Sequence, residues 1–208
     1  GTLAASDPEG DVLAYRLIDD AQGLFAIDAA TGVVTTTAAL DYEAVKSYQI
    51  VARATDIGGL HTDYGFTISV NDVNEAPVAT ADAVAVDEDA TTANLWSTLL
   101  GNDRDPDAGQ ALSIVKVDTS GTLGSVIFDA ATQTLKYVAD HDAFDALATG
   151  ASQIDRFTYT VSDGHGLTST ASVAVTVTGI ADGVVRTGSI FADTLTGTAG
   201  EDRLSGGF

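Results

Sequence analysis

Residues 155–178 read DRFTYTVSDGHGLTSTASVAVTVT, two alternating segments that flank an Asp and two glycines. Phe157, Tyr159 and Val161 alternate with small polar residues, and valines return at every second position over residues 173–177. Successive side chains of a β-strand point to opposite faces of the sheet, so each segment is expected to bury one face. The stretch therefore predicts two neighbouring β-strands joined by a Gly-rich turn.

The same plan occurs twice in the chain. Residues 48–59, YQIVARATDIGG, are an alternating segment that ends in an Asp and glycines, as residues 155–166 are. Residues 5–15, ASDPEGDVLAY, resemble residues 102–114, NDRDPDAGQALSI, with spaced acids, a Pro and a Gly before a strand-like segment. Short alternating segments at this spacing are typical of antiparallel β-sandwiches, so we expect an all-β fold of tandem sandwiches. A helix is compatible only as an insertion, around residues 142–147.

The composition narrows the class of function. The 208 residues contain 30 acidic and nine basic side chains, which give a formal charge of −21. With so few cations, no basic surface is expected for binding nucleic acid or for inserting into anionic membranes. Hydrophobic residues make up 45% of the chain, enough for a core, and no apolar run is long enough to cross a bilayer. Cys is absent, so disulfides cannot cross-link the fold, and the acidic excess indicates a divalent cation instead.

The acidic residues gather in turns. Two loops carry an acidic residue at every second position: Asp7, Glu9 and Asp11, and then Asp103, Asp105 and Asp107. Carboxylates about 4 Å apart repel each other by about 4 kcal/mol at an effective dielectric of about 20, against a total domain stability of about 5–15 kcal/mol. Either these side chains splay apart and cap turns, or Ca²⁺ lies between them. The loop at residues 103–114 does not have EF-hand register, because its twelfth residue is Ile114 rather than Glu.

Residues 1–77 resemble a bacterial cadherin-type repeat whose first strand would precede Gly1. The resemblance rests on four motifs: ASDPEGD (5–11), LDYE (40–43), ATDIGG (54–59) and DVNEAP (72–77). It implies a Greek-key β-sandwich of the cadherin/Ig-like kind. In cadherin-type arrays, Ca²⁺ ions lie between successive domains, so the resemblance also implies Ca²⁺ as the bound ion.

Residues 78–181 resemble the bacterial VCBS/cadherin-like repeat. The motifs are VDEDA (86–90), LLGNDRDPDAG (99–109), LKYVAD (135–140) and DRFTYTVSDG (155–164). Residues 182–208 are similar to a linker followed by the start of an RTX nonapeptide segment, since GTAGED (197–202) approximates Gly-Gly-x-Gly-x-Asp. Together the three resemblances imply a slice of a large adhesin, secreted or at the cell surface, that is exported by type I secretion.

The resemblance assigns Ca²⁺ ligands to three places. A well-loaded junction near Pro77 would use residues from both repeats and the linker: Asp41, Glu43, Asp72, Asn74, Glu75, Asp105, Asp107 and Asp163, with Asp103 as a further candidate. Half of another site would face a preceding domain: Asp7, Glu9, Asp11 and Asp56. A weaker junction is expected at the far end of the second repeat, with Glu88 and Asp182. No strong site is expected in the RTX-like segment.

The implied function is calcium-dependent adhesion, in which Ca²⁺ stiffens a rod of tandem repeats. The expected partners are neighbouring repeats of the same chain and cell-surface or matrix ligands, and no catalytic role is expected. No GxSxG or HExxH motif occurs in the chain. His61, His141 and His165 lie in different parts of the sequence, which favours exposed loop histidines over a zinc site.

Two alternatives stay open. One is an accessory module that binds carbohydrate for a secreted enzyme, with Trp96 and Tyr137 stacking on a sugar. The competing interpretation places Trp96 in the core, on a strand at residues 93–100. The other alternative is an enzyme domain with paired carboxylates, although the acids lie in turn motifs rather than in an aromatic-lined cleft.

Overall fold

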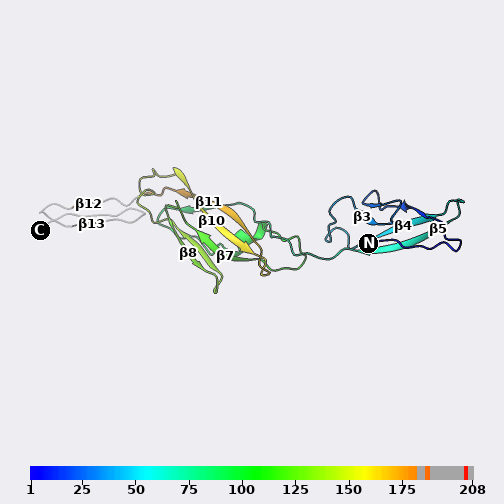
Figure 1. The fold of residues 1–208 in the computed structure, drawn as a ribbon. Helices are drawn as coiled ribbons and strands as arrows, with labels where there is room; N and C mark the ends of the chain where they lie inside the picture. Colours follow the sequence, from blue (N-terminus) through cyan, green and yellow to red (C-terminus); the bar gives the residue numbers. More distant parts are fainter. Residues whose placement is uncertain (182–185, 188–203, 206–208) are drawn as a thin grey trace. The chain divides into compact units, whose positions relative to one another are not determined.

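The structure is a computed structural model that describes residues 1–181, 186–187 and 204–205. The chain divides into two compact units, Gly1–Asn74 (unit 1) and Glu75–Phe208 (unit 2). Both are built mainly from β-strands, drawn as arrows in Figure 1, and the expected all-β sandwich class is confirmed. In the part of the chain that is described, no helix is long and apolar enough to span a membrane.

Unit 1 combines a three-stranded antiparallel sheet with a two-stranded hairpin. The sheet has the order β1-β4-β5, with strands β1 (Ala14–Asp19), β4 (Ser47–Thr55) and β5 (His61–Ser69). The hairpin consists of β2 (Phe25–Ile27) and β3 (Val34–Thr36). The alternation in β4 has its predicted effect, because Ile50, Ala52 and Ala54 are buried while the residues between them are more exposed.

Unit 2 is organised by a four-stranded sheet with the order β6-β11-β10-β7. Its strands are β6 (Asp82–Asp87), β7 (Ser113–Asp118), β10 (Ser152–Ser162) and β11 (Thr168–Thr178). β6 runs parallel to β11, whereas the β10–β11 and β10–β7 pairs are antiparallel. Two further sheets are the β8 (Ser125–Asp129) and β9 (Thr134–Val138) hairpin and the parallel pair β12 (Arg186–Thr187) and β13 (Leu204–Ser205).

The core of unit 2 is formed by the strand faces on which the alternating pattern places the apolar residues. Phe157, Tyr159 and Val161 of β10 are buried together with the valines at 173–177 in β11. From β9, Tyr137 adds a ring stacked on Phe157, with the two centroids 6.3 Å apart. Burying one large apolar side chain contributes about 1.5–3 kcal/mol, so these faces account for a large part of the stability of the unit.

Trp96 lies in the core, as expected, but not on a strand. It begins the four-residue helix α1 (Trp96–Leu99), which continues as the 3₁₀ turn η1 (Leu100–Asn102). Trp96 is 7% exposed, and its indole stacks on Phe128 of β8. The expected strand at residues 93–100 is therefore wrong, because the chain turns here to place an apolar corner over the β8–β9 hairpin.

Residues 142–147 form successive turns, so the helix considered there is absent. The backbone hydrogen bonds span three residues, from Phe144 N–H to His141 O and from Leu147 N–H to Phe144 O. Phe144 is fully buried. A single turn gains too few hydrogen bonds to form a stable helix. The segment is held in place by the buried ring of Phe144 instead.

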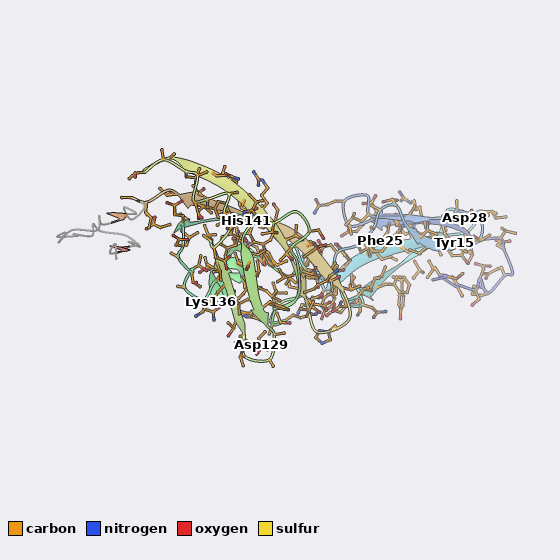
Figure 2. All side chains as sticks on the ribbon, turned by 90° about the vertical axis from the view of Figure 1, so that its left-hand side faces the viewer. Tyr15, Phe25, Asp28, Asp129, Lys136 and His141 are labelled. Atoms are coloured by element: carbon orange, nitrogen blue, oxygen red, sulfur yellow. The ribbon has the colours of Figure 1, made fainter. Side chains whose placement is uncertain are left out.

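The two units share a hairpin turn that carries the same residues. DAATG (28–32) joins β2 to β3, and DAATQ (129–133) joins β8 to β9. Asp28 and Asp129, both labelled in Figure 2, accept hydrogen bonds from the backbone N–H groups two and three residues later and from a Thr hydroxyl. The Thr hydroxyl and then the backbone donors lower the pKa of both carboxyls. Here the acids cap turns, as surface Asp residues commonly do.

A buried carboxylate ties β10 to the loop before β8. Asp155 is 4% exposed, and its Oδ2 accepts the hydroxyl hydrogen of Tyr137 at 2.6 Å. The same oxygen accepts the N–H groups of Leu123 and Gly124, and Oδ1 accepts the N–H of Arg156. Burial acts to raise the pKa of Asp155, but these donors outweigh it and lower the pKa. Asp155 is thus held as an anion inside the unit.

Asp155→Ala is expected to destabilise unit 2 by about 3 kcal/mol, because four donors lose a charged acceptor. Trp96 is the single Trp of the chain and lies in this core, so its fluorescence during urea unfolding measures the loss. Asp145→Ala, at an exposed position, is the control and should leave the midpoint unchanged. Since the pKa of Asp155 is lowered on folding, its contribution is present above about pH 4 and is lost as the pH falls through the lowered value. Equal midpoints for the two variants would contradict this role.

Candidate metal sites

At one end of unit 2, the linker lies against the acidic loop that follows η1. Val78 and Arg104 exchange two backbone hydrogen bonds, of 2.7 and 3.1 Å, which fix the chain entering the unit. Asp107 is buried, and its Oδ2 accepts the N–H of Glu75 at 2.9 Å. Carboxylate oxygens of Glu75 and Asp107 lie within 4.8 Å of each other. Asp105 shapes the loop, since its Oδ1 accepts the N–H of Asp107.

Asp163 follows β10 at the same end of the unit. It is 2% exposed, and its Oδ1 accepts three backbone N–H groups, those of His165, Gly166 and Leu167. The ring of His165 is hydrogen-bonded through Nδ1 to Oε1 of Gln110, at 2.9 Å. This bond joins the loop after β10 to the acidic loop after η1, so the structure brings Asp163 into the same group of loops as Asp105 and Asp107.

The donor set fits Ca²⁺ in its chemistry. Oδ2 of Asp105 is buried, and no hydrogen-bond partner for it lies within the described residues. A buried charged oxygen without a partner is costly, and removing that cost requires a proton, a donor or a cation. All of the candidate ligands here offer oxygen atoms, which is the ligand type that Ca²⁺ prefers, six to eight at about 2.3–2.6 Å.

Asp103 behaves differently from its neighbours in the loop. Its Oδ1 accepts the N–H of Thr80 at 2.7 Å, and both of its oxygens lie 3.1 Å from the hydroxyl of Tyr159. The side chain is therefore engaged by β10 and by the segment before β6. Alternating spacing predicts convergence of Asp103, Asp105 and Asp107, whereas the carboxylate of Asp103 is hydrogen-bonded to Thr80 and Tyr159.

Unit 1 presents its candidate residues near the end of its last strand. Oδ1 of Asp41 accepts the N–H of Ala44 at 3.0 Å, which closes a turn that leaves Asp41 and Glu43 exposed. The turn is fastened to the segment after β5, because Val70 N–H donates to the carbonyl oxygen of Lys46. Asp72 is also exposed and follows two residues later. These acids are accessible to a cation.

The other acidic end of unit 1 brings together part of the expected half-site. Asp7 uses Oδ1 to accept the N–H groups of Glu9 and Asp11, and Asp56 accepts the N–H of Leu60. Asp7, Glu9 and Asp56 line one surface cavity of about 390 Å³. The residues that line this cavity do not include Asp11, so three of the four expected ligands share a surface.

Glu88 is the most deeply buried acidic residue described, at 1% exposure. Its Oε1 accepts the N–H of Ile180 at 2.7 Å, and its Oε2 is buried with no hydrogen-bond partner among the described residues. The second residue expected at this end, Asp182, lies outside the described residues, as does most of the RTX-like segment. Glu88 therefore meets the same chemical test as Asp105, while its expected partner stays a prediction.

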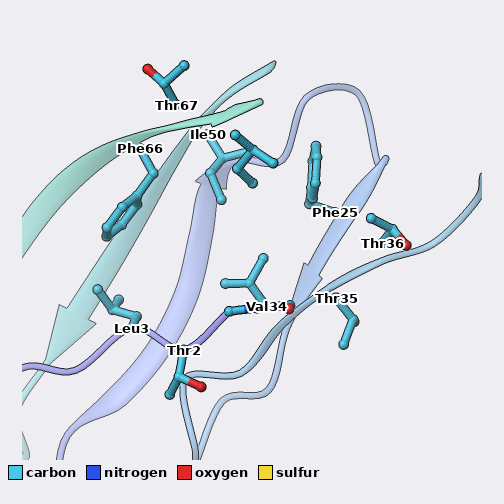
Figure 3. Close-up of a pocket in the computed structure, with 11 residues that line it drawn as sticks. Thr2, Leu3, Phe25, Val34, Thr35, Thr36, Ile50, Phe66 and Thr67 are labelled. Carbon is cyan, nitrogen blue, oxygen red and sulfur yellow. Dashed lines mark hydrogen bonds between the residues drawn. The ribbon is translucent and has the colours of Figure 1, made fainter. Parts of the chain in front are cut away.

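Another surface cavity of unit 1 is mainly apolar and is not lined by the acids. It has a volume of about 420 Å³ and lies between β5, the β2–β3 hairpin and the first residues of the chain. Figure 3 shows Leu3, Phe25, Ile50 and Phe66 around it, and none of the candidate ligands lines it. A mainly apolar lining without carboxylates is poorly suited to a divalent cation.

The two aromatic residues considered for sugar binding are both buried. Trp96 is stacked on Phe128, and Tyr137 is fully buried with its hydroxyl bound to Asp155. A ring that stacks on a sugar needs an exposed face. The carbohydrate alternative therefore loses the residues on which it rested.

Sequence reasoning missed several residues that position the acids. Gln110 and Thr80 supply hydrogen bonds to the loops, and neither belongs to a charged motif. Asp82 accepts hydrogen bonds from Asn102 and from Tyr159, whose hydroxyl also lies beside Asp103. Asn102 stands inside the LLGNDRDPDAG motif, directly before Asp103. This position was the one signal in the sequence that could have identified a residue that positions the acids.

These features define a class of protein: tandem all-β domains with acidic loops at their ends, chemically suited to cations. The model of the bacterial cadherin-like domain matches residues 74–179, and the model of the cadherin domain matches residues 1–71. The chain belongs to the bacterial cadherin-like domain family. Domains of the cadherin type are adhesion modules that bind Ca²⁺ at sites between domains.

Similar proteins are much longer than this chain. It is 39% identical over 79 residues to Cadherin-17 of Rattus norvegicus, which is 37% of this chain and 10% of that protein. It is 31% identical over 193 residues to Protocadherin-16 of Rattus norvegicus, which is 87% of this chain and 6% of that protein. The crystal structure of human Protocadherin-24 EC1-2 aligns with a TM-score of 0.50 at 18% identity, over 86% of this chain and 87% of that one. At this identity, the likeness concerns the fold alone.

In calcium-free protein, Asp105→Ala should cost about 1 kcal/mol of stability or less, because losing the acceptor of the Asp107 N–H is offset by removing the buried Oδ2 that has no partner among the described residues. Asp163→Ala should cost about 3 kcal/mol, since three backbone donors lose their acceptor. Urea unfolding followed by Trp96 fluorescence compares the two variants with the wild type. Similar losses for both would mean that Oδ2 of Asp105 also has a structural partner and is not held ready for a cation.

Proposed function

We propose that this chain is a calcium-binding extender and adhesion module of a secreted bacterial RTX-type adhesin. Ca²⁺ bound between the first and the second repeat stiffens the tandem array. The observation that carries the proposal is the buried, unpartnered Oδ2 of Asp105, next to the buried Asp107 and the linker residue Glu75. Family membership supports it, because cadherin domains bind Ca²⁺ between domains.

The proposed ligands come from both repeats. In unit 1 and the linker they are Asp41, Glu43, Asp72, Asn74 and Glu75, and in unit 2 they are Asp105, Asp107 and Asp163. Asp103 is left out, because its oxygens are engaged by Thr80 and Tyr159. Asp7, Glu9, Asp11 and Asp56 would complete a site with a preceding repeat, and Glu88 with Asp182 would do so with a following one.

The physical mechanism is linkage. Ca²⁺ binds the arrangement in which the ligands of both repeats converge and not the bent or unfolded arrangement, so it stabilises the former by RT ln(1 + [L]/Kd). Extracellular calcium modules have Kd values of about 10⁻⁴–10⁻³ M. Millimolar Ca²⁺ outside the cell therefore loads such a site, while micromolar cytosolic Ca²⁺ leaves it empty, and the chain stiffens after export.

The finer assignment rests on the sequence resemblances. The VCBS-like motifs at 86–164 and the RTX-like residues 188–208 support a bacterial adhesin that leaves the cell by type I secretion. Neighbouring repeats of the same chain are the first partners, and cell-surface or matrix molecules are the second. The domain boundaries at 77 and 181 belong to this proposal as well.

Removing Ca²⁺ with EGTA is expected to lower the melting temperature by several degrees, because about 2 kcal/mol of linkage energy corresponds to a shift of about 4–8 °C in a chain of this size. Scanning calorimetry with and without EGTA provides the measurement. The Kd range above calls for EGTA at roughly 2 mM. Mg²⁺ added in place of Ca²⁺ is the control for ionic strength. An identical melting curve in all three conditions would reject the calcium mechanism.

Glu43→Ala is expected to reduce the number of Ca²⁺ ions bound, whereas Asp11→Ala should leave it unchanged. Glu43 belongs to the proposed complete site, and Asp11 to one that needs another repeat. Isothermal titration calorimetry of both variants gives the stoichiometry. If both variants lose the same number of ions, the division into complete and half sites is wrong.

A further inference from the structure

The acidic loop after η1 (residues 103–110) is attached to the four-stranded sheet of unit 2 through the side chain of Tyr159. The hydroxyl of Tyr159 lies 3.1 Å from each carboxylate oxygen of Asp103, the residue with which the loop begins. The N–H of Thr80 donates a hydrogen bond to the same carboxylate at 2.7 Å. The phenol donates to one oxygen at a time, and Oδ2 of Asp82 lies 2.8 Å away as another acceptor. The start of the loop thus meets β10, an inner strand of the sheet.

β10 also leads to one of the proposed calcium ligands. Tyr159, Val161 and Asp163 occupy alternate positions and are all buried, so their side chains point to the same face. Asp163 follows directly after the end of the strand. Because β10 is hydrogen-bonded to β11 on one side and to β7 on the other, its residues are held more precisely than those of a loop. One strand therefore carries a ligand at its end and, four residues earlier, a contact to the other ligand loop.

Hydrogen bonds inside the acidic loop give it a shape but not a position. Oδ1 of Asp105 accepts the N–H of Asp107, and the carbonyl oxygen of Asp107 accepts the N–H of Gln110. Both bonds would persist if the loop moved as a body relative to β10. The separation between the carboxylates of the loop and Asp163 therefore depends on contacts that leave the loop.

Of the contacts that tie the acidic loop to the rest of unit 2, the one at Tyr159 reaches a residue of the core. Gln110 is bonded to the ring of His165, but this bond is exposed, so water competes for both groups. Arg104 is bonded to Val78 of the linker, which lies outside the four-stranded sheet. A hydrogen bond in the low-dielectric interior is stronger than one in water. Tyr159 is therefore the residue best placed to fix the loop against the sheet.

We propose that Tyr159 is a positioning residue for calcium binding. Through Asp103, its hydroxyl holds the loop carboxylates at the distance from Asp163 that a shared ion requires. This role rests on the proposed calcium function and deepens it, because Asp103 becomes a support for the loop and is not a ligand. A ligand loop that is already in place loses little conformational freedom when the ion binds, so more of the interaction energy appears as affinity.

Tyr159→Phe in the whole chain tests this role, because it removes the hydroxyl and keeps the ring in the core. The Kd for Ca²⁺ is expected to rise by about tenfold while the number of bound ions stays the same, and isothermal titration calorimetry measures both. Tyr137→Phe is the matched control. Tyr137 is also fully buried, but its hydroxyl binds Asp155, which in turn holds the loop before β8. This variant should lower the melting temperature and leave the Kd unchanged.

Two substitutions of Asp103 distinguish a support from a ligand. Asp103→Ala removes the acceptor and should raise the Kd by about tenfold, as Tyr159→Phe does. Asp103→Asn removes the same charge but keeps an oxygen that accepts from Thr80 and Tyr159, so its Kd should stay close to that of the wild type. Equal losses of affinity in both variants, or one fewer bound ion in Asp103→Asn, would mean that Asp103 is itself a ligand and would overturn the proposal.

A calcium-free measurement separates this role from the calcium function. In ¹⁵N relaxation experiments, the order parameters of the Asp105 and Asp107 amides should fall from about 0.85 to about 0.6 in Tyr159→Phe and stay high in Tyr137→Phe. Trp96 fluorescence checks that each variant is folded, and the two Asp103 variants carry the test if Tyr159→Phe does not fold.

The outcomes are distinct. Wild-type protein that binds no Ca²⁺ would reject the calcium function, and the positioning role with it. If the wild type binds Ca²⁺, an unchanged Kd or unchanged order parameters in Tyr159→Phe would overturn the positioning role alone. An equal rise of the Kd in Tyr137→Phe would also overturn it, since the effect would then follow from a general loss of stability.

Discussion

A carboxylate that leaves water needs an N–H donor, a proton or a cation, and unit 2 depends on how this requirement is met. Asp155 and Asp163 are satisfied by donors, four for the first and three for the second. Asp105 and Glu88 keep one buried oxygen each with no partner among the described residues. The acids in one small unit thus divide into those that build the fold and those that suit a ligand, and burial alone does not separate the two kinds.

The sheets and their buried faces follow closely from the sequence. A period of two over residues 157–161 and 173–177 is long enough to exclude a helix, and both runs are buried in the structure. The segment at Trp96 could not be assigned in the same way, because a run of four residues is too short for periodicity to separate a strand from a helical turn. At residues 142–147, one buried ring decides the local conformation, which no pattern in the sequence reveals.

The acidic loops were predicted from spacing, but the direction of each side chain was not. Asp103, Asp105 and Asp107 are equivalent in the sequence, yet Asp103 bonds to Tyr159 and Asp105 does not. The difference comes from a contact with β10, which lies more than fifty residues away. Long-range contacts of this kind set the roles of individual acids, and a single sequence does not contain the register that creates them. The carbohydrate alternative loses its two aromatic residues for a related reason, since Trp96 and Tyr137 are core residues.

The parallel pairing of β6 with β11 determines how unit 2 responds to a pulling force. Six residue pairs join them, from Asp82 with Val173 to Asp87 with Thr178. The chain enters unit 2 ahead of Asp82 and leaves the sheet after Thr178, so tension along the chain draws two parallel neighbours past each other lengthwise. In that shearing geometry, all the hydrogen bonds between the strands must fail together, whereas peeling would break them one by one. The order of strands in this sheet therefore makes the unit mechanically resistant, whatever its ligands are.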